Sequence, residues 1–410
     1  MTATINSAST IAALRIRYKD GVEKEDFDKA ATFYKVMGRA TDFNGDSYAM
    51  TINTDGTQGA GVSVPLAQTA LAQSPNYRFS VTRVRYYSLA RVTGEAMKAA
   101  RDAGAVMNLW ENEMQRASYT LNREMAFQVH RSGNGVRGTL LSSGSGVASL
   151  TVTIQDDGGI NFFAVNMIVG AAQTAGGANR TGTATVVAID RTARTLTTSG
   201  SNWNAQITSL ADGDSLFRAG DGANGGTNVL LTGVDSWINT AALFGLTRTP
   251  DPIKLGGQTK DCTGIPIEEL GSELSTLLQQ QGAMPPDLLV VNPDEGNKLR
   301  KSLIARSIYV RNEVKGATAG VSFKTFEIEG PMGTISVLED INRAKKTGFL
   351  TRKDTWRLHT LGPCPQILNF DTQEMLRVYN DDSYEVRLGM YGNVECTRPL
   401  DTVRCTNIGV

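Results

Sequence analysis

The longest regular pattern in this sequence is a helical one that runs through residues 93–131. Apolar side chains recur there at steps of three or four residues from Met97 to Val129, which is the spacing of one buried helix face. Thr93 is a suitable N-cap, and Glu95 lies in the first turn, where a negative charge suits the helix dipole. The pattern therefore predicts one unusually long amphipathic helix, about 55 Å from end to end.

Three glycines directly after this helix have the G-x-G-x-x-G spacing of a dinucleotide-binding loop. They are Gly133, Gly135 and Gly138, within the stretch RSGNGVRGTL. A dinucleotide loop needs a strand before it and a helix that begins inside it, because the helix N-terminus binds the pyrophosphate. Here a helix precedes the glycines, and the serine- and glycine-rich run after Leu141 does not favour a new helix. We therefore expect Gly133 to be the left-handed residue that follows the helix, and we expect no nucleotide site.

Residues 41–75 alternate weakly between apolar and polar side chains. A first run at residues 48–52 and a second run at residues 62–64 flank a glycine-rich stretch, which predicts a long hairpin with a flexible tip. The segment has few large apolar residues, so it cannot form a core of its own. A hairpin of this kind must lie on its own domain or on a neighbouring subunit.

Charge and histidine content exclude several kinds of function. The chain has 41 Lys and Arg residues and 41 Asp and Glu residues, whereas a nucleic-acid clamp normally has a surplus of basic residues. Its two histidines, His130 and His359, lie far apart and in no metal-ligand spacing. The sequence has neither a nucleophile elbow nor a P-loop. We therefore expect no enzyme activity and no catalytic, cofactor-binding or metal site.

The cysteines and the N-terminus bear on the cellular compartment. The four cysteines form no C-x-x-C pair, which favours reduced thiols in a cytosolic protein; they are Cys262, Cys364, Cys396 and Cys405. The N-terminus lacks the basic segment and apolar run of a signal peptide. Apolar runs elsewhere are too short to cross a membrane.

The pattern of residue types changes twice in the rest of the chain. Short β-like runs alternate with Gly, Asn, Asp and Ser through residues 147–233, which predicts a small all-β module, either a barrel or a sandwich. After Leu246 the pattern becomes α/β, with one helix from Pro266 to Gly282 and another capped by Asn292. The other predicted elements are an extended arm at residues 11–18, a short helix at 20–36, strands at 77–92, 287–291, 325–329, 333–338 and 347–350, and a hairpin at 383–396 that turns at Gly392 and Asn393.

This order of elements resembles the major capsid proteins of tailed bacteriophages, the Hong Kong 97-type fold. GNGVRGTL at residues 133–140 resembles the glycine turn after the family's spine helix. PPDLLVVNPDEGNKLRKSL at residues 285–303 is similar to the strand, Asn-Pro and helix of its axial domain, and YEVRLGMYGNVECTRPL at residues 384–400 is similar to its terminal strands. The order of elements carries the resemblance, which covers nearly the whole chain except residues 147–233.

The resemblance implies an α+β capsid fold with an inserted small all-β domain. Its parts are an N-terminal arm and short helix at residues 1–40, an extended loop or hairpin at 41–76, a peripheral domain with the spine helix at 77–146, the inserted β domain at 147–233, an axial domain at 234–355, and return strands of the peripheral and axial domains at 356–410.

The function that the resemblance implies is that of a major capsid protein. Such a protein self-assembles through hexamers and pentamers into the icosahedral head that encloses the double-stranded DNA genome of a tailed phage, without sequence-specific DNA binding. Its location is the virion, after assembly in the bacterial host cytoplasm and without a membrane. A portal protein, a separate scaffold protein and a decoration protein are further partners that this family uses. An encapsulin-like nanocompartment shell has the same fold and is the alternative.

One departure from the family's type member concerns covalent cross-links. In that protein a lysine of the extended loop forms an isopeptide bond with an asparagine of a neighbouring subunit. This sequence has no lysine between Lys35 and Lys98. We therefore expect no cross-link by this chemistry.

Overall fold

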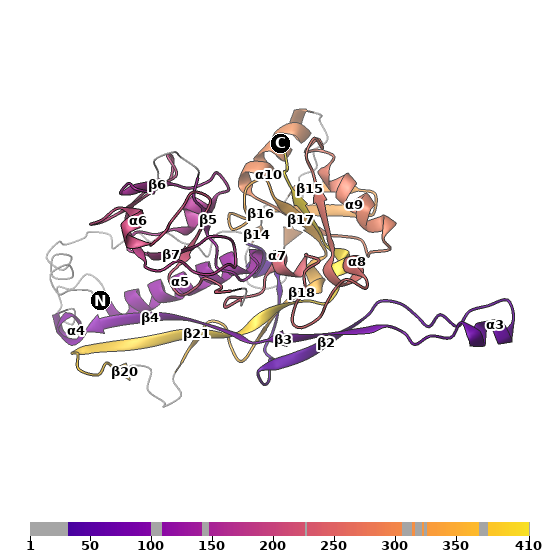
Figure 1. The fold of residues 1–410 in the computed structure, drawn as a ribbon, viewed down its shortest axis with the longest axis horizontal. Coiled ribbons are helices and arrows are strands. Elements are labelled where there is room, and N and C mark those ends of the chain that lie inside the picture. The colour runs from indigo at the N-terminus through magenta and orange to yellow at the C-terminus, as the bar shows by residue number, and fades with distance from the viewer. Residues whose placement is uncertain are drawn as a thin grey trace.

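The computed structural model describes residues 32–99, 109–141, 147–225, 228–305, 314–315, 322–323, 326–368 and 376–409. Figure 1 shows a long sheet along the molecule, a helix above it, two further β units beyond the helix, and a hairpin that projects to the right. The expected arm at residues 11–18 and most of the expected helix at residues 20–36 lie outside the described residues. The described end of that helix is α2, Phe33–Val36.

The expected long helix is described in two parts, α4 (Gly94–Ala99) and α5 (Leu109–His130), and residues 100–108 between them lie outside the described residues. The Oγ1 of Thr93 accepts a hydrogen bond from the backbone N–H of Ala96 at 3.3 Å, as expected of an N-cap. At the other end, Gly133 has a φ of +81°, which confirms its left-handed conformation.

The glycines after α5 allow close backbone approaches. A Cβ on Gly135, whose φ is +79°, would lie 2.2 Å from the carbonyl oxygen of Asp221. The chain then enters the strand β5 (Gly138–Thr139). Because a helix precedes the glycines and a strand follows them, the segment has the opposite polarity to a dinucleotide-binding loop.

The long sheet has β21 (Ser383–Cys396) at its centre. This strand pairs antiparallel with β4 (Val84–Thr93) from Ser383↔Thr93 to Gly392↔Val84. α5 packs against both strands and covers one face of the sheet. The other strands of the sheet are β1 (Gly38–Ala40), β18 (Trp356–Thr360), β19 (Gln366–Ile367) and β20 (Leu376–Arg377).

The predicted hairpin at residues 383–396 is wrong, because β21 continues through Gly392 and Asn393 without a turn. A Cβ on Gly392 would lie 2.1 Å from the carbonyl oxygen of His359 on the neighbouring strand, so this glycine permits a close strand contact. The buried side chain of Asn393 donates to the carbonyl of Thr82 at 2.8 Å and accepts from the N–H of Thr232 at 2.9 Å. Gly392 and Asn393 therefore make contacts between separate segments of the chain and do not form a turn.

The predicted β module is a six-stranded barrel. Its strands follow the order β5, β10 (Ser215–Arg218), β7 (Ile168–Ala172), β8 (Ala184–Asp190), β9 (Thr195–Thr198) and β6 (Thr151–Thr153). The first and last strands meet through a bridge between Leu140 and Ile154, where Leu141 N–H donates to Thr153 and Gln155 N–H donates to Thr139, both at 2.9 Å. The sheet thus closes around its own apolar core, which includes Trp203 and Phe163.

A buried charge cluster joins this barrel to the long sheet and to α5. Arg137 donates to Glu124 of α5 at 3.2 Å and to Asp221 at 3.3 Å. Tyr86 of β4 donates to Asp221, and Arg218 of β10 donates to Tyr86, both at 3.2 Å. Removing one partner of such a buried pair typically costs about 3–5 kcal/mol, so the cluster fixes the barrel against the helix.

The third unit is a mixed sheet in the order β11 (Gln258–Asp261), β22 (Val403–Thr406), β17 (Gly348–Thr351), β12 (Leu288–Val291), β16 (Gly333–Glu339) and β15 (Phe326–Gly330). The strands predicted at residues 287–291, 325–329, 333–338 and 347–350 are confirmed within this sheet. Its helices are α9 (Leu270–Gln280) and α10 (Pro293–Ala305). Asn292 caps α10 by accepting from the N–H of Asp294 at 3.1 Å, as predicted. Shorter elements are α6 (Trp203–Gln206), α7 (Val234–Trp237), α8 (Pro252–Gly256), β13 (Val314–Lys315) and β14 (Ser322–Phe323).

A buried carboxylate connects the long sheet's helix to the mixed sheet. Asp340, directly after β16, accepts from the N–H of Phe33 at 2.7 Å and lies 2.8 Å from Nε2 of His130 at the end of α5. Burial alone would raise the pKa of Asp340, but His130 and the backbone donors outweigh burial and lower it. Asp340 is therefore the point at which three segments meet: the first described residues of the chain, the end of α5 and the end of β16.

The expectation of four reduced thiols is wrong for two of the cysteines. Cys262 and Cys405 form a disulfide with a Cα–Cα distance of 6.1 Å, whereas Cys364 and Cys396 are free. The parallel pairing of β11 with β22 brings the first two together across a sequence separation of 143 residues. Such a contact has no signature in cysteine spacing.

Thiol alkylation of the denatured, non-reduced protein tests this pairing. We expect intact mass to show labels on two cysteines, Cys364 and Cys396, and labels on all four after reduction, because disulfide sulfurs do not react with an alkylating agent. The control Cys405→Ser should show three labels without reduction. Four labels on the non-reduced wild-type protein would contradict the disulfide.

Candidate assembly surface on the projecting hairpin

The hairpin begins as two paired strands and ends as a free tip. β2 (Ser47–Asn53) pairs antiparallel with β3 (Asn76–Thr82) through their whole length. Residues 54–75 continue outward from this pair, carry the short helix α3 (Val64–Thr69), and reach farther from the body than any other segment drawn in colour in Figure 1.

The hairpin prediction is confirmed, but its second strand is in a different place. Residues 62–64 were expected to pair with residues 48–52, and they lie instead at the tip, where α3 begins. The partner strand is β3, whose Phe79 and Val81 are fully buried. A strand is fixed where its alternating side chains can reach a core, and the tip offers none.

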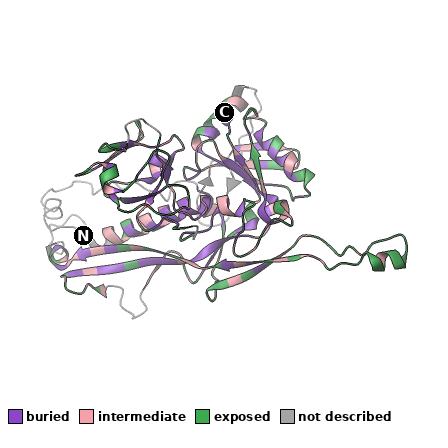
Figure 2. Ribbon diagram, in the orientation of Figure 1, coloured by how far each residue is buried: buried purple, intermediate pink, exposed green. Residues whose placement is uncertain are grey.

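The tip is an exposed apolar surface without charge. α3 has no buried residue, and four large side chains are open to solvent: Val62 (97% exposed), Val64 (69%), Leu66 (55%) and Leu71 (68%). Figure 2 shows the tip in green over most of its length. Residues 56–77 contain no charged side chain. Exposed apolar side chains gathered in this way mark an interaction surface.

A histidine and two carboxylates hold the segment that leads into the hairpin. His359 of β18 lies 2.6 Å from Asp42 through Nδ1 and pairs with Glu395 of β21 through Nε2. The ring of Tyr48 on β2 packs at 5.0 Å from the His359 ring, and Phe43 packs edge-on against Tyr48 at 5.1 Å. The base of the hairpin is therefore tied to the long sheet by ion pairs and by aromatic packing.

The two carboxylates change the titration of His359. Burial by itself lowers the pKa of His359, but hydrogen bonds with Glu395 and Asp42 outweigh burial and raise this pKa above its usual value of 6.5. In return, the hydrogen bond from His359 holds the pKa of Asp42 below its usual value of 3.8. The protonated histidine is thus the form that the folded hairpin base stabilises.

A lysine fixes the hairpin where it leaves the body. Lys254 of α8 donates to the carbonyl of Thr54 at 3.0 Å and to the carboxylate of Asp55 at 2.7 Å. Asp251 lies 3.6 Å from the same ammonium group. The position where the tip begins is therefore held against the body by both backbone and side-chain contacts.

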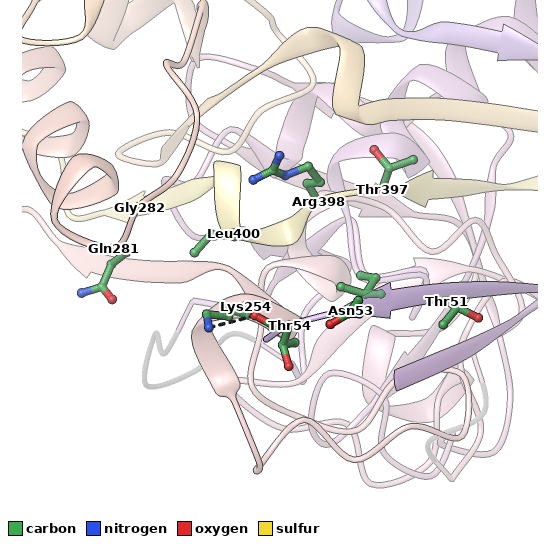
Figure 3. A pocket seen from close by; sticks show the side chains of 10 residues that line it. Thr51, Asn53, Thr54, Lys254, Gln281, Gly282, Thr397, Arg398 and Leu400 are labelled. Carbon is green, nitrogen blue, oxygen red and sulfur yellow. Dashed lines mark hydrogen bonds between the residues drawn. The ribbon is translucent and has the colours of Figure 1, made fainter. Parts of the chain in front are cut away.

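A polar pocket of about 500 Å³ lies beside this anchor (Figure 3). One wall belongs to β2 and the residue after it, and the other belongs to the end of α9 and the link between β21 and β22. Its lining residues are Thr51, Ile52, Asn53, Thr54, Lys254, Gln281, Gly282, Thr397, Arg398 and Leu400.

A second exposed surface lies on the long sheet, on β4 and β21. Tyr87 is 42% exposed and Leu89 is 55% exposed, and the ring of Tyr87 packs edge-on against Tyr391 at 5.9 Å. Glu385 accepts from Arg91 at 2.7 Å beside these residues. This surface is formed by two paired strands, in contrast to the hairpin tip.

The histidines that the sequence singled out belong to separate polar clusters, His130 with Asp340 and His359 with Asp42 and Glu395. No group of three His, Cys, Asp or Glu side chains within the described ranges is arranged to hold a metal ion. None of the helices in this part of the chain has the length and apolar content to cross a membrane. The absence of a catalytic, cofactor or metal site stays a prediction.

The substitution His359→Gln tests the hairpin base. At about pH 6 we expect it to lower the free energy of unfolding by about 1.5–3 kcal/mol, the usual contribution of a hydrogen bond to a charged group. Because the folded-state pKa is raised, this contribution is complete below the unfolded value of about 6.5 and is lost as the pH rises through the folded value. Asp42 sets the lower end of this pH range. Because its pKa is lowered in the folded state, the stability that its carboxylate contributes is lost as the pH falls below about 4.

Urea unfolding of the unassembled subunit, wild type against His359→Gln, gives the measurement. The difference between the two should be largest between about pH 5 and 6.5 and should shrink towards about pH 9. In the background of Asp42→Asn the effect of the histidine substitution should be smaller. A difference that stays constant from about pH 6 to pH 9 would count against this account.

Comparison with solved structures shows which known fold the chain resembles. No protein-family model matches the sequence, and no curated protein matches it significantly. Among solved structures, a chain in the capsid asymmetric unit of cyanophage A-1(L) is similar with a TM-score of 0.56 and 8% identity, over 96% of this chain and 97% of that one. Lower scores of 0.48 are found for the encapsulin SrpI of Synechococcus elongatus PCC 7942 (7% identity, 99% and 96% covered) and for the capsid of a native GTA particle (8% identity, 99% and 100% covered).

The fold assignment therefore rests on the cyanophage structure together with the elements described above. It confirms, at the level of the fold, the resemblance drawn from the order of the sequence elements. The chain has the α+β fold of a phage capsid protein.

Proposed function

We propose that this chain is a major capsid protein that self-assembles into the icosahedral head of a tailed phage around double-stranded DNA. The fold of the cyanophage capsid chain supports the proposal. The observation that carries it is the hairpin, which extends away from the body and exposes four large apolar side chains on an uncharged tip. Exposed apolar side chains gathered on one projecting segment favour contact with a partner that buries them.

The partner is a second copy of the same chain. Burial of each exposed Val or Leu side chain contributes roughly 1.5–3 kcal/mol, so the four together supply a large part of one subunit contact. The tip projects away from the body of its own subunit (Figure 1), so it is free to reach a different surface on the next copy. A contact between unlike surfaces repeats head to tail, and it closes into a ring when the rotation between neighbouring copies divides a full turn, as it does in hexamers and pentamers.

The zero net charge suits a shell around packaged DNA. Strong attraction between a basic inner surface and the phosphates would oppose both packaging and release. The chain has equal numbers of basic and acidic residues. It therefore encloses DNA in this proposal without sequence-specific binding.

The proposal assigns the parts of the chain to the parts of a capsid subunit. Residues 1–40 are the N-terminal arm and short helix, residues 41–76 the extended loop, residues 77–146 the peripheral domain, residues 147–233 the inserted domain, residues 234–355 the axial domain, and residues 356–410 the return strands. Five of the six barrel strands lie within residues 147–233, and the sixth, β5 (Gly138–Thr139), belongs to the preceding segment and pairs with β10. Assembly takes place in the host cytoplasm, and the portal, scaffold and decoration proteins are the further partners.

Substitution of the tip tests self-assembly. The variant Val62→Ser, Val64→Ser, Leu66→Ser, Leu71→Ser is expected to fold and to give at least about tenfold fewer particles, because it removes the apolar area that the contact buries. Negative-stain electron microscopy and sedimentation count the particles, and circular dichroism reports the fold. The matched control Gln68→Ala, Gln73→Ala changes polar residues of the same tip and should assemble like the wild type.

Normal particle yield from the four-residue variant would contradict the role of the tip. A wild-type chain that stays monomeric under all conditions would contradict the proposed function itself. Particles purified from a phage-producing culture should contain double-stranded DNA. Particles that enclose a protein cargo instead would favour the encapsulin-like alternative.

A denaturing gel of boiled, reduced particles tests the cross-link expectation. We expect a single band at 44.0 kDa, because residues 36–97 offer no lysine amine for an isopeptide bond. A ladder of covalent oligomers would refute it.

A further inference from the structure

The strand β2 has one free edge. Within the described part of the chain it pairs with β3 alone. The N–H of Thr54 donates to Pro75, and the carbonyl of Asp46 accepts from Arg83, so the even-numbered residues of this register turn their backbone groups towards β3. In an antiparallel pair the intervening residues turn theirs the other way. The outward-facing residues are Ser47, Ala49, Thr51 and Asn53.

Among the described residues, β2 itself has none of the features that usually protect an edge strand. Natural edge strands are blocked by lysine, proline, a bulge or a covering segment, since an open row of N–H and C=O groups invites another strand. The pairing of β2 with β3 runs without a register shift. The four outward-facing residues are exposed and have small or uncharged polar side chains. The edge is therefore a ready template for strand addition.

The polar pocket opens at the same edge (Figure 3). Thr51 and Asn53 line it, and Gln281 and Thr397 belong to the opposite wall. Its two cations already have partners: Lys254 pairs with Asp55 and Asp251, and Arg398 lies 3.2 Å from Asp401. A pocket with hydrogen-bonding groups but no spare charge suits an uncharged, extended peptide backbone better than an ion.

We propose that an extended segment of a neighbouring copy of this chain adds as a third strand to the free edge of β2. The proposal deepens the proposed function and rests on it, since it names where one subunit receives another. A second copy is the occupant that the charges favour, because residues 56–63 and 70–75, which flank α3, form uncharged and mostly exposed irregular runs in each copy that match a pocket without spare charge. Each copy offers one edge and one such stretch, so the contact can repeat around a ring.

Amide hydrogen exchange resolved to single residues tests the proposal directly. In the unassembled subunit the amides of Met50 and Ile52 should be protected by β3, and those of Thr51 and Asn53 should exchange freely. In shells assembled from the purified chain alone, the amides of Thr51 and Asn53 should exchange at least about tenfold more slowly. Free exchange of these two amides in intact shells would overturn the proposal, whether or not shells form.

Two substitutions of Thr51 separate the contribution of its backbone N–H to assembly from that of its side chain. Thr51→Pro removes the outward N–H, which proline tolerates at an edge that faces away from the partner strand. It should reduce the yield of particles at least about tenfold, whereas Thr51→Val keeps the N–H and should assemble like the wild type. Protection of Met50 and Ile52 in unassembled Thr51→Pro shows that the hairpin is intact. If that variant does not fold, the exchange measurement on wild-type shells still decides.

The outcomes separate this inference from the proposed function. Wild-type chain that forms no shell under any condition, with or without its scaffold protein, contradicts the proposed function. Shells that form normally from both Thr51 variants, with Thr51 and Asn53 unprotected, overturn the strand addition and leave the capsid function standing. Protection that requires a second protein in the shell contradicts the choice of a neighbouring copy as the occupant.

Discussion

The ladder between β21 and β4 is the contact on which the rest of the subunit depends. It joins a strand near the C-terminus to a strand from the first quarter of the chain, from Ser383↔Thr93 to Gly392↔Val84. α5 packs on one face of this ladder, the barrel is fastened to α5 by the buried pair of Arg137 and Glu124, and the hairpin leaves from the ladder's other end through β3. A ladder of this length is stiff, so the projecting tip has a fixed origin.

Local signals in the sequence predicted the elements that depend on local physics. The end of α5 followed from its apolar period and from Gly133, because glycine readily adopts the left-handed conformation in which a chain leaves a helix. The start of α10 followed from Asn292 in the same way, since capping needs only neighbouring residues. The hairpin's existence and its lack of a core were also predictable, which is why part of the candidate assembly surface could be found from the sequence.

Contacts between distant segments could not be predicted in this manner. Gly392 and Asn393 have the composition of a turn, yet a neighbouring strand and two distant segments determine their role. Cys262 and Cys405 become partners only through the pairing of β11 with β22. The register of β2 against β3 decides that the backbone groups of Thr51 face the free edge. The alternation of apolar and polar residues in the sequence does not indicate which edge of a strand stays unpaired.

The barrel enters and leaves the fold through strands that lie side by side. Thr139 of β5 is the register partner of Ser215 of β10, so the two points where the barrel joins the rest of the chain are neighbours in space. A module attached in this way places no demand on the distance between its flanking segments, and its length can change without altering the path of the chain around it. Because of this attachment, a longer, shorter or absent barrel would leave the ladder between β4 and β21 in place.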